Sequence, residues 1–239
     1  MPPQLDPEIY TVAWIAPLEI ETKATLHIMD CLYPGRFPMG RGDDYVFRAG
    51  ECGGHNIVIA TFPAGQKYGT GSAAALANQV KKFFPNLWFG LLVGVAAGLP
   101  NLTRDPPRNI RLGNVLVTLP DGENAGLVAY NFAVTPRLNI GHHRNGNPEY
   151  DKFYTIGKDG GEKVVDKKLR PISQRIRIWY GRIGSGEKLI KDGRKKDQLR
   201  NAYDFIGFEM EAAGTINRIP VGVIRGVCNY RDLHKNKRW

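Results

Sequence analysis

The chain has 239 residues, of which 42% are hydrophobic, and this is enough for one sizeable core. Its composition excludes a disordered or fibrous protein, so we predict a single domain over residues 1–239. Much of the formal net charge of +10 lies in Lys188–Arg200 and in the tail His234–Arg238. No aromatic residue is interleaved within Lys188–Arg200, and no nucleic-acid motif adjoins either cluster, which favours a solvated surface over a nucleic-acid interface.

Cysteine usage and the apolar runs favour a soluble cytoplasmic protein. Cys31, Cys52 and Cys228 are an odd number at no metal-ligand spacing, which favours a reducing compartment. The N-terminus lacks the apolar segment of a signal peptide. The longest apolar run, Leu87–Pro100, contains glycines and is too short to span a bilayer. The five histidines have no metal-ligand partners at helical spacing, so we predict no metal.

Strand and helix patterns alternate through the first half of the chain. Tyr10–Ile15 is a β-rich apolar run, and a helical pattern extends from Leu18 to about Asp30. Leu87–Val95 is the most apolar stretch, as expected of a central strand that is buried on both faces. Between them we predict strands at Tyr45–Arg48 and Asn56–Phe62 and a closely packed helix at Ala73–Phe84.

The second half continues this alternation around one irregular segment. Residues 133–171 are polar and Gly-rich without helical or strand periodicity, which indicates a mobile or incompletely represented loop. The other predicted elements are strands at Arg108–Leu119, Leu127–Phe132, Arg175–Ile183, Asp204–Phe208 and Val221–Cys228, a basic helix in Lys188–Arg200, and a helix at Ala212–Asn217. Such alternation predicts a parallel-dominated α/β sheet with helices on both faces.

The segment Phe208–Gly214 places two carboxylates, Glu209 and Glu211, around Met210 directly after a predicted strand. Ligands of α/β proteins bind at strand ends, where a carboxylate can accept two hydrogen bonds from a sugar diol and a thioether can contact a ring. The alternative is a charged first helical turn, which the helix dipole favours. Glu21, just after the first strand, has the same two interpretations.

Six segments taken together resemble the purine nucleoside phosphorylase and nucleosidase superfamily, and most of all its fungal members that stand alone or at the N-terminus of NLR-like proteins. These segments are Ala16–Glu21, Pro63–Gly65 with Tyr68–Thr70, Val93–Gly98, Gly184–Gly186, Phe208–Gly214 and the tail after Arg225. The likeness covers nearly the whole chain in the right order. It implies a three-layer sandwich in which helices flank a central mixed, mostly parallel sheet.

The resemblance implies a set of substrate-binding residues. Glu211 resembles the carboxylate that binds the ribose 2′- and 3′-hydroxyls, and Met210 resembles the residue that packs under the sugar. The other candidates, for the ribose and the base pocket, are Phe208, Glu209, Val95, Ala96, Ala97, Leu189 and Ile190.

The resemblance also implies the catalytic residues. Glu21 resembles the carboxylate that activates the attacking water in the nucleosidase branch. The family's proton donor to the purine N7 is an aspartate, and Asn229 stands at that position. An asparagine donates a hydrogen bond but no proton. Asn229 is therefore either a substitution made to trap a ligand or a natural loss in a protein that senses nucleosides. Asp232 matches a second acidic position of the family.

Hydrolysis is favoured over phosphorolysis at this stage. The phosphorylases hold phosphate with arginines, but here the matching positions are the acidic turn Pro17–Glu21 and Leu92. The sequence therefore predicts a purine nucleoside N-ribohydrolase that needs no cofactor. A phosphorylase and a silent nucleoside-sensing domain are the alternatives. The resemblance further implies a homo-oligomer and leaves open that the chain is part of a larger NLR-like protein.

Overall fold

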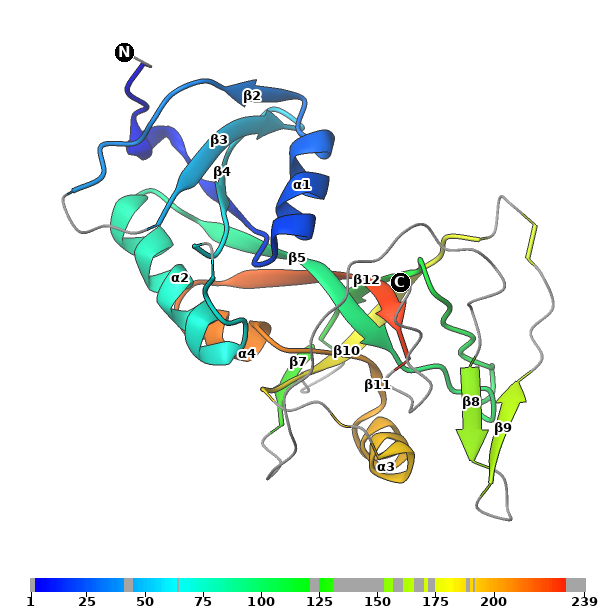
Figure 1. Ribbon diagram of the computed structural model, residues 1–239. Coiled ribbons are helices and arrows are strands. Elements are labelled where there is room, and N and C mark those ends of the chain that lie inside the picture. Colours follow the sequence, from blue (N-terminus) through cyan, green and yellow to red (C-terminus); the bar gives the residue numbers. More distant parts are fainter. Residues whose placement is uncertain are drawn as a thin grey trace. The chain divides into compact units, whose positions relative to one another are not determined.

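The computed structural model describes residues 3–40, 45–63, 65–120, 125–130, 153–156, 161–165, 170–171, 175–187, 190 and 192–230 (Figure 1). Its contacts divide the chain into two compact units. Unit 1 comprises residues 1–94 and 210–224, and unit 2 comprises residues 95–209 and 225–239. The single-domain organisation stays a prediction.

Unit 1 contains the N-terminal strands and three of the helices. Its elements are the short 3-10 helix η1 (Pro7–Ile9), β1 (Val12–Ile15), α1 (Glu19–Ile28), β2 (Cys31–Tyr33), β3 (Phe47–Cys52), β4 (His55–Ala60), α2 (Thr70–Phe83), α4 (Ala212–Thr215), and the first parts of β5 (Phe89–Gly98) and β12 (Val221–Asn229). The strand order is β5-β1-β4-β3-β2. Strand β1 is parallel to β4 and β5, whereas β3 is antiparallel to β2 and β4.

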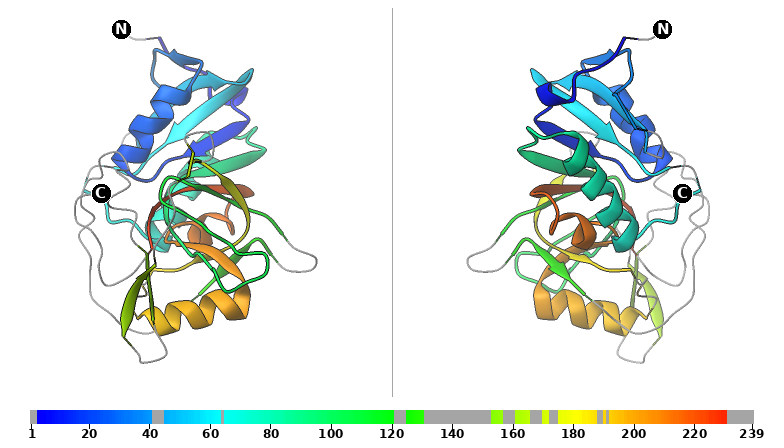
Figure 2. Two further views of the ribbon diagram at one scale, coloured as in Figure 1. Left: turned by 90° about the vertical axis from the view of Figure 1, so that its right-hand side faces the viewer. Right: turned by 90° about the vertical axis from the view of Figure 1, so that its left-hand side faces the viewer.

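The strands of unit 1 are covered on both faces. From β1 the chain passes through α1, β2 and β3 to β4 on one side of β1, and from β4 it passes through α2 to β5 on the other side. Right-handed crossovers in opposite directions place the two helices on opposite faces of a sheet, as Figures 1 and 2 show. On the α1 face, Trp14 and Ile59 pack with Leu26, so burial of apolar surface holds this helix in place.

Unit 2 contains the remaining strands and one long helix. Its elements are β6 (Val115–Thr118), β7 (Leu127–Ala129), β8 (Phe153–Ile156), β9 (Glu162–Val165), β10 (Ile178–Ser185), α3 (Gly193–Tyr203), β11 (Phe205–Glu209), and the last parts of β5 and β12. The strand order is β11-β10-β6-β12-β5. Strand β10 is parallel to β11, β6 and β7, whereas β11 pairs antiparallel with the end of β5.

The predicted fold class is confirmed, because a mixed, mostly parallel sheet is flanked by helices. Two details differ from the prediction. Strand β2 was not predicted, since it has three residues and lies at the edge of the sheet. The segment 133–171 was predicted without strands, yet it contains the antiparallel pair β8 and β9. Each has only four residues, too few to give a clear period in a polar segment. Much of this segment lies outside the described residues.

Within the described ranges, the structure has no helix that is both long and apolar enough to cross a membrane.

Candidate functional site

In unit 1, Glu211 lies at the N-terminus of the short helix α4. The residue is 7% exposed, and its backbone carbonyl accepts a 3.1 Å hydrogen bond from the Thr215 hydroxyl. Helix α4 packs against the beginning of α2 without any space for a side chain at Gly214, because a Cβ there would lie 1.9 Å from the Thr70 carbonyl oxygen. The close approach of α2 therefore fixes the position of Glu211, and it explains the glycine of the Phe208–Gly214 segment.

Tyr68 is a neighbour of Glu211 that the sequence analysis did not assign. Its pKa is raised above the ordinary tyrosine value, first by burial and then by the negative charge of Glu211. A phenol that keeps its proton is a hydrogen-bond donor, whereas a carboxylate is an acceptor. Unit 1 thus places a hydrogen-bond donor, the Tyr68 phenol, near an acceptor, the Glu211 carboxylate. Tyr68 belongs to one of the six segments that carry the resemblance, but the sequence alone does not show that it lies near Glu211.

Glu21, also in unit 1, lies in the first turn of α1. Its carboxylate oxygen accepts a hydrogen bond of 2.8 Å from the Leu18 backbone N–H, and the residue is 7% exposed. This contact satisfies a backbone donor at the helix start, as the first-turn interpretation expects, and a catalytic role of Glu21 stays a prediction. Nearby Glu19 is exposed and forms an ion pair with Lys23 at 2.7 Å. Of the two glutamates, Glu21 is the buried one.

In unit 2, Asn229 ends strand β12 beside the end of β5. Its amide nitrogen lies 3.2 Å from the Cys228 sulfur, and the Cys228 thiol donates to the Ala96 carbonyl at 3.5 Å. Cys228 thus contacts both Asn229 and Ala96, and a shared role of these two residues in a site stays a prediction. Asp232 lies outside the described residues.

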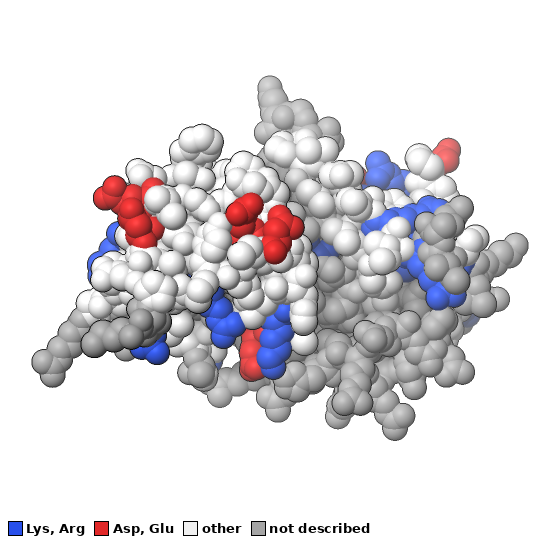
Figure 3. Space-filling model, turned by 90° about the horizontal axis from the view of Figure 1, so that it is seen from above, with Lys and Arg blue, Asp and Glu red and all other residues white. Residues whose placement is uncertain are grey.

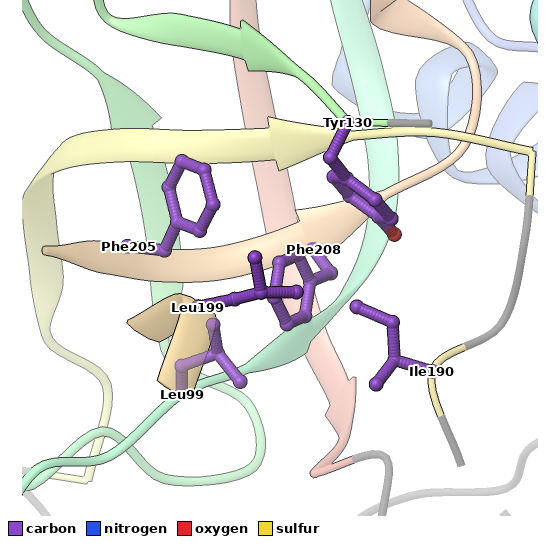
Figure 4. Packing of buried hydrophobic residues seen from close by; sticks show 6 residues of the cluster. All are labelled: Leu99, Tyr130, Ile190, Leu199, Phe205 and Phe208. Carbon is purple, nitrogen blue, oxygen red and sulfur yellow. The ribbon is translucent and has the colours of Figure 1, made fainter. Parts of the chain in front are cut away.

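Phe208 lies in the hydrophobic core of unit 2 (Figure 4). Its ring meets those of Tyr130 and Phe205 edge-on, at centroid distances of 5.0 and 5.5 Å. Phe208 also pairs with Ala97 across β11 and β5, and Ile190 belongs to the same cluster. Phe208 is fully buried, so its ring could only support the wall of a base pocket from behind and does not present a surface of its own. Of the remaining candidates, Val95 is half-buried and Leu189 lies outside the described residues.

Glu209, also in unit 2, forms an ion pair with Arg225 of β12, and neither side chain is exposed. This arrangement assigns Glu209 a structural contact that the sequence analysis missed. The sequence could have indicated such a contact, because Arg225 is the one charged residue within the apolar strand Val221–Cys228. A buried charge of this kind requires an opposite partner. A role of Glu209 in substrate binding stays a prediction.

Among the described residues, the structure contains no group of three or more His, Cys, Asp or Glu side chains that could hold a metal ion. The predicted independence of a metal and of other cofactors stays a prediction.

No protein-family profile matches this chain. Among curated proteins, it is similar to a nucleotide-binding leucine-rich repeat (NLR)-like protein from Hyaloscypha variabilis. The two sequences are 31% identical over an alignment of 288 residues, which covers 99% of this chain and 28% of the relative. The chain therefore spans less than a third of that relative's length.

Among solved structures, the chain is similar to the 5′-methylthioadenosine/S-adenosylhomocysteine nucleosidase of Neisseria meningitidis in complex with methylthio-immucillin-A. The TM-score is 0.56 at 18% identity, and the match covers 93% of this chain and 87% of the other. A futalosine hydrolase mutant of Helicobacter pylori matches with a TM-score of 0.56 at 17% identity, covering 92% and 89% of the two chains.

A third similar structure is an aspartate-to-asparagine mutant of the Helicobacter pylori 5′-methylthioadenosine/S-adenosylhomocysteine nucleosidase with 5′-methylthioadenosine in the active site. The TM-score is 0.55 at 17% identity, with 93% of this chain and 87% of the other covered. At these identities, the likeness shows a shared fold.

Proposed function

Because this chain has the fold of the purine nucleoside phosphorylase and nucleosidase superfamily, we propose that it is a purine nucleoside N-ribohydrolase. It cleaves the N-glycosidic bond of an adenosine-type or guanosine-type nucleoside to give free base and ribose. The observation that carries this proposal is Glu211, a nearly buried carboxylate at the start of α4, with Met210 before it and the phenol of Tyr68 close by. This combination suits a ribose ring and its diol.

In this proposal, Glu211 accepts hydrogen bonds from the ribose 2′- and 3′-hydroxyls, and Met210 contacts the apolar face of the sugar. Val95, Ala96 and Ala97 are the candidates for backbone contacts beside the ribose and base, because small residues let a ligand approach the backbone closely. The base contacts Leu189 and Ile190, with Phe208 behind them. Glu209 supports the site through its ion pair with Arg225.

Water is the proposed nucleophile, and two positions support this choice over phosphate. Leu92 is fully buried in β5 and offers neither a positive charge nor a hydrogen-bond donor to an anion. Glu21 carries a negative charge, which would repel phosphate but can activate a water molecule as a general base. The Leu18 N–H that binds one of its carboxylate oxygens orients this side chain.

Departure of the purine is the step that Asn229 would limit. Protonation of N7 neutralises the leaving base, and general-acid catalysis of this kind contributes roughly a hundredfold or more. The Asn229 amide supplies a hydrogen bond without a transferable proton. We therefore expect low turnover of the protein with Asn229. Asp232 is the nearest acidic residue in the sequence and is a second candidate for this role.

The experiment is chromatographic detection of free base from adenosine and from guanosine, with and without phosphate. It compares the protein with its Asn229→Asp and Asn229→Ala variants. We expect base release by Asn229→Asp without phosphate, at a rate at least about a hundredfold above that of the parent. The Asn229→Ala variant is the matched control, because it removes the amide without adding an acid.

Two outcomes would contradict the proposal. Base release that requires phosphate would identify a phosphorylase and overturn the interpretation of Leu92 and Glu21. Binding of nucleoside without base release by Asn229→Asp would identify a sensing domain, the function that Asn229 itself favours.

The biological setting forms part of the proposal. The curated relative is an NLR-like protein that is much longer than this chain, so the chain is consistent with a nucleosidase domain of such a protein. Its free thiols suit the cytoplasm. We propose a homo-oligomer that acts on small-molecule nucleosides and needs no cofactor.

A further inference from the structure

Unit 2 contains a cleft of about 340 Å³ whose lining includes no candidate residue of the nucleoside site. We call it the arginine cleft. Four parts of the chain form it: the segment 104–108, residues 119–120 directly after β6, residues 179–182 of β10, and residues 204–206 at the beginning of β11. It is lined by Arg104, Pro106, Pro107, Arg108, Leu119, Pro120, Trp179, Tyr180, Gly181, Arg182, Asp204 and Ile206.

The lining of the arginine cleft is positively charged. Arg104, Arg108 and Arg182 contribute three guanidinium groups, whereas Asp204 is the one carboxylate among these residues. Asp204 binds Arg108 at 2.9 Å, but the Arg104 guanidinium lies 3.5 Å away, too far for a strong hydrogen bond. The single aspartate therefore lies near two of the three guanidinium groups, and the third, Arg182, donates to the Tyr203 carbonyl at 3.2 Å. On the face drawn in Figure 3, Lys and Arg lie next to Asp and Glu in several places.

The base of the arginine cleft is fixed. Arg108 is 4% exposed, and it donates to the Asp204 side chain and to the Phe205 carbonyl, both at 2.9 Å. The pKa of Arg108 is lowered, first by burial and also by the positive charges of Arg104 and Arg200, although Asp204 opposes this change. Arg104, whose side chain is 46% exposed, is accessible at the rim of the cleft.

Aromatic and apolar groups complete the lining. Tyr180 is 60% exposed and Leu119 is 51% exposed, so both present apolar surface at the cleft. Phosphates bind well to arginine, because its guanidinium can donate two parallel hydrogen bonds. The volume falls at the lower end of the range of small-molecule sites, about 300 to 1,000 Å³. It exceeds what a phosphate ion needs and leaves room for a ring beside Tyr180.

We propose that the arginine cleft is a second ligand site that binds a mononucleotide, with the phosphate on Arg104 and Arg182 and the base against Tyr180. Arg108 and Asp204 hold the shape of the cleft. A long nucleic acid is disfavoured because the cleft is small and no aromatic residue is interleaved within the basic run Lys188–Arg200. The site is separate from the proposed nucleosidase chemistry, so either assignment can fail alone.

The test is calorimetric titration with AMP, repeated with excess adenosine to occupy the nucleoside site. We expect AMP to bind under both conditions, and the double variant Arg104→Gln, Arg182→Gln to weaken binding at least tenfold. Arg194→Gln is the matched control, because it removes the same charge from an exposed position on α3 that is not part of the cleft. Circular dichroism checks that each variant is folded.

A second arm distinguishes a nucleotide from free phosphate. Tyr180→Ala should weaken AMP binding about tenfold and leave the binding of inorganic phosphate unchanged. If AMP and phosphate bind equally and Tyr180→Ala affects neither, the site is one for the free anion and the nucleotide assignment is wrong. If Arg194→Gln weakens AMP as much as the cleft variant does, or if no AMP binds at millimolar concentration, the cleft is not a ligand site.

Discussion

The buried pair Glu209–Arg225 supports the sheet at the residue where β11 ends. Removing one partner of such a pair leaves an uncompensated buried charge, which typically costs about 3–5 kcal/mol. We therefore expect Glu209→Gln to lower the free energy of unfolding by about this amount, as measured by urea denaturation. Glu19→Gln is the matched control, since its ion pair with Lys23 is exposed and such pairs contribute about 1 kcal/mol or less. Equal effects of the two variants would argue against the buried pair.

Tyr68 gives a prediction about alkaline pH. Its pKa is raised in the folded protein by burial and by Glu211, so the folded state retains the phenolic proton to higher pH than the unfolded state does. Its contribution to stability is complete below the ordinary tyrosine pKa of about 10 and is lost as the pH rises through the folded value. Tyr68→Phe should therefore flatten the loss of stability above pH 10. Urea unfolding at pH 8 to 11 measures this difference.

Tyr10 and Tyr33 also have raised pKa values, but they remain in the Tyr68→Phe variant. The difference between the two proteins therefore isolates Tyr68. Parallel curves for the protein and its variant would show that Tyr68 does not titrate beside Glu211.

At the scale of elements, the contact between α2 and α4 predicts the effect of two glycine substitutions. Gly214→Ala would place a Cβ 1.9 Å from the Thr70 carbonyl oxygen, so one helix must shift. Overpacking of this kind costs about 1–3 kcal/mol, or more where backbone has to move. Gly71→Ala is the matched control on α2, because its Cβ would meet nothing within 4 Å. Alanine should stabilise that position by up to about 1 kcal/mol.

Thermal unfolding of the two alanine variants measures this contrast. A Gly214→Ala protein that is as stable as the parent would show that α4 does not lie against Thr70. Since Glu211 begins α4, the same variant should also weaken nucleoside binding, whereas Gly71→Ala should leave it unchanged.

The elements that the sequence predicts well are those with long apolar patterns. Leu87–Val95 corresponds to β5, and Val221–Cys228 corresponds to β12 with a difference of one residue at its end. The prediction of Arg108–Leu119 as one strand was too long, because β6 contains only Val115–Thr118. Arg108 instead binds Asp204 and Phe205, which are distant in sequence. Contacts of this kind override local β-propensity and leave no periodic signal.

At the scale of the whole molecule, the three cysteines predict a simple labelling pattern. None of these three described cysteines forms a disulfide in the structure, where Cys31 is exposed and Cys52 and Cys228 are half-buried. We expect a thiol reagent to modify Cys31 rapidly and Cys228 slowly, since its sulfur is held at the Ala96 carbonyl. Cys31→Ser should remove the fast phase. A fast phase that persists in this variant would contradict the described burial, and a mobility change on reduction would reveal a disulfide.

The candidate site was predicted less completely than the fold. The resemblance supplied Glu211, Met210 and Asn229, because these positions follow recognisable strand ends. It supplied neither the Tyr68 neighbour of Glu211 nor the Arg225 partner of Glu209. Both pairs join residues that are far apart in the chain, and a single sequence does not show which distant charges meet.

The chain passes from one unit to the other within β5, directly after β11 and within β12, and this limits how genes of relatives can be recombined. The chain crosses between the two units at residues 94–95, 209–210 and 224–225. A chimaera with one junction after Gly94 would take Thr70 from one parent and Gly214 from the other. Their contact leaves no space for a side chain, so the parents must match at this point. Exchange of a whole unit needs three junctions, and we expect gene shuffling to succeed only when residues 210–224 travel with residues 1–94.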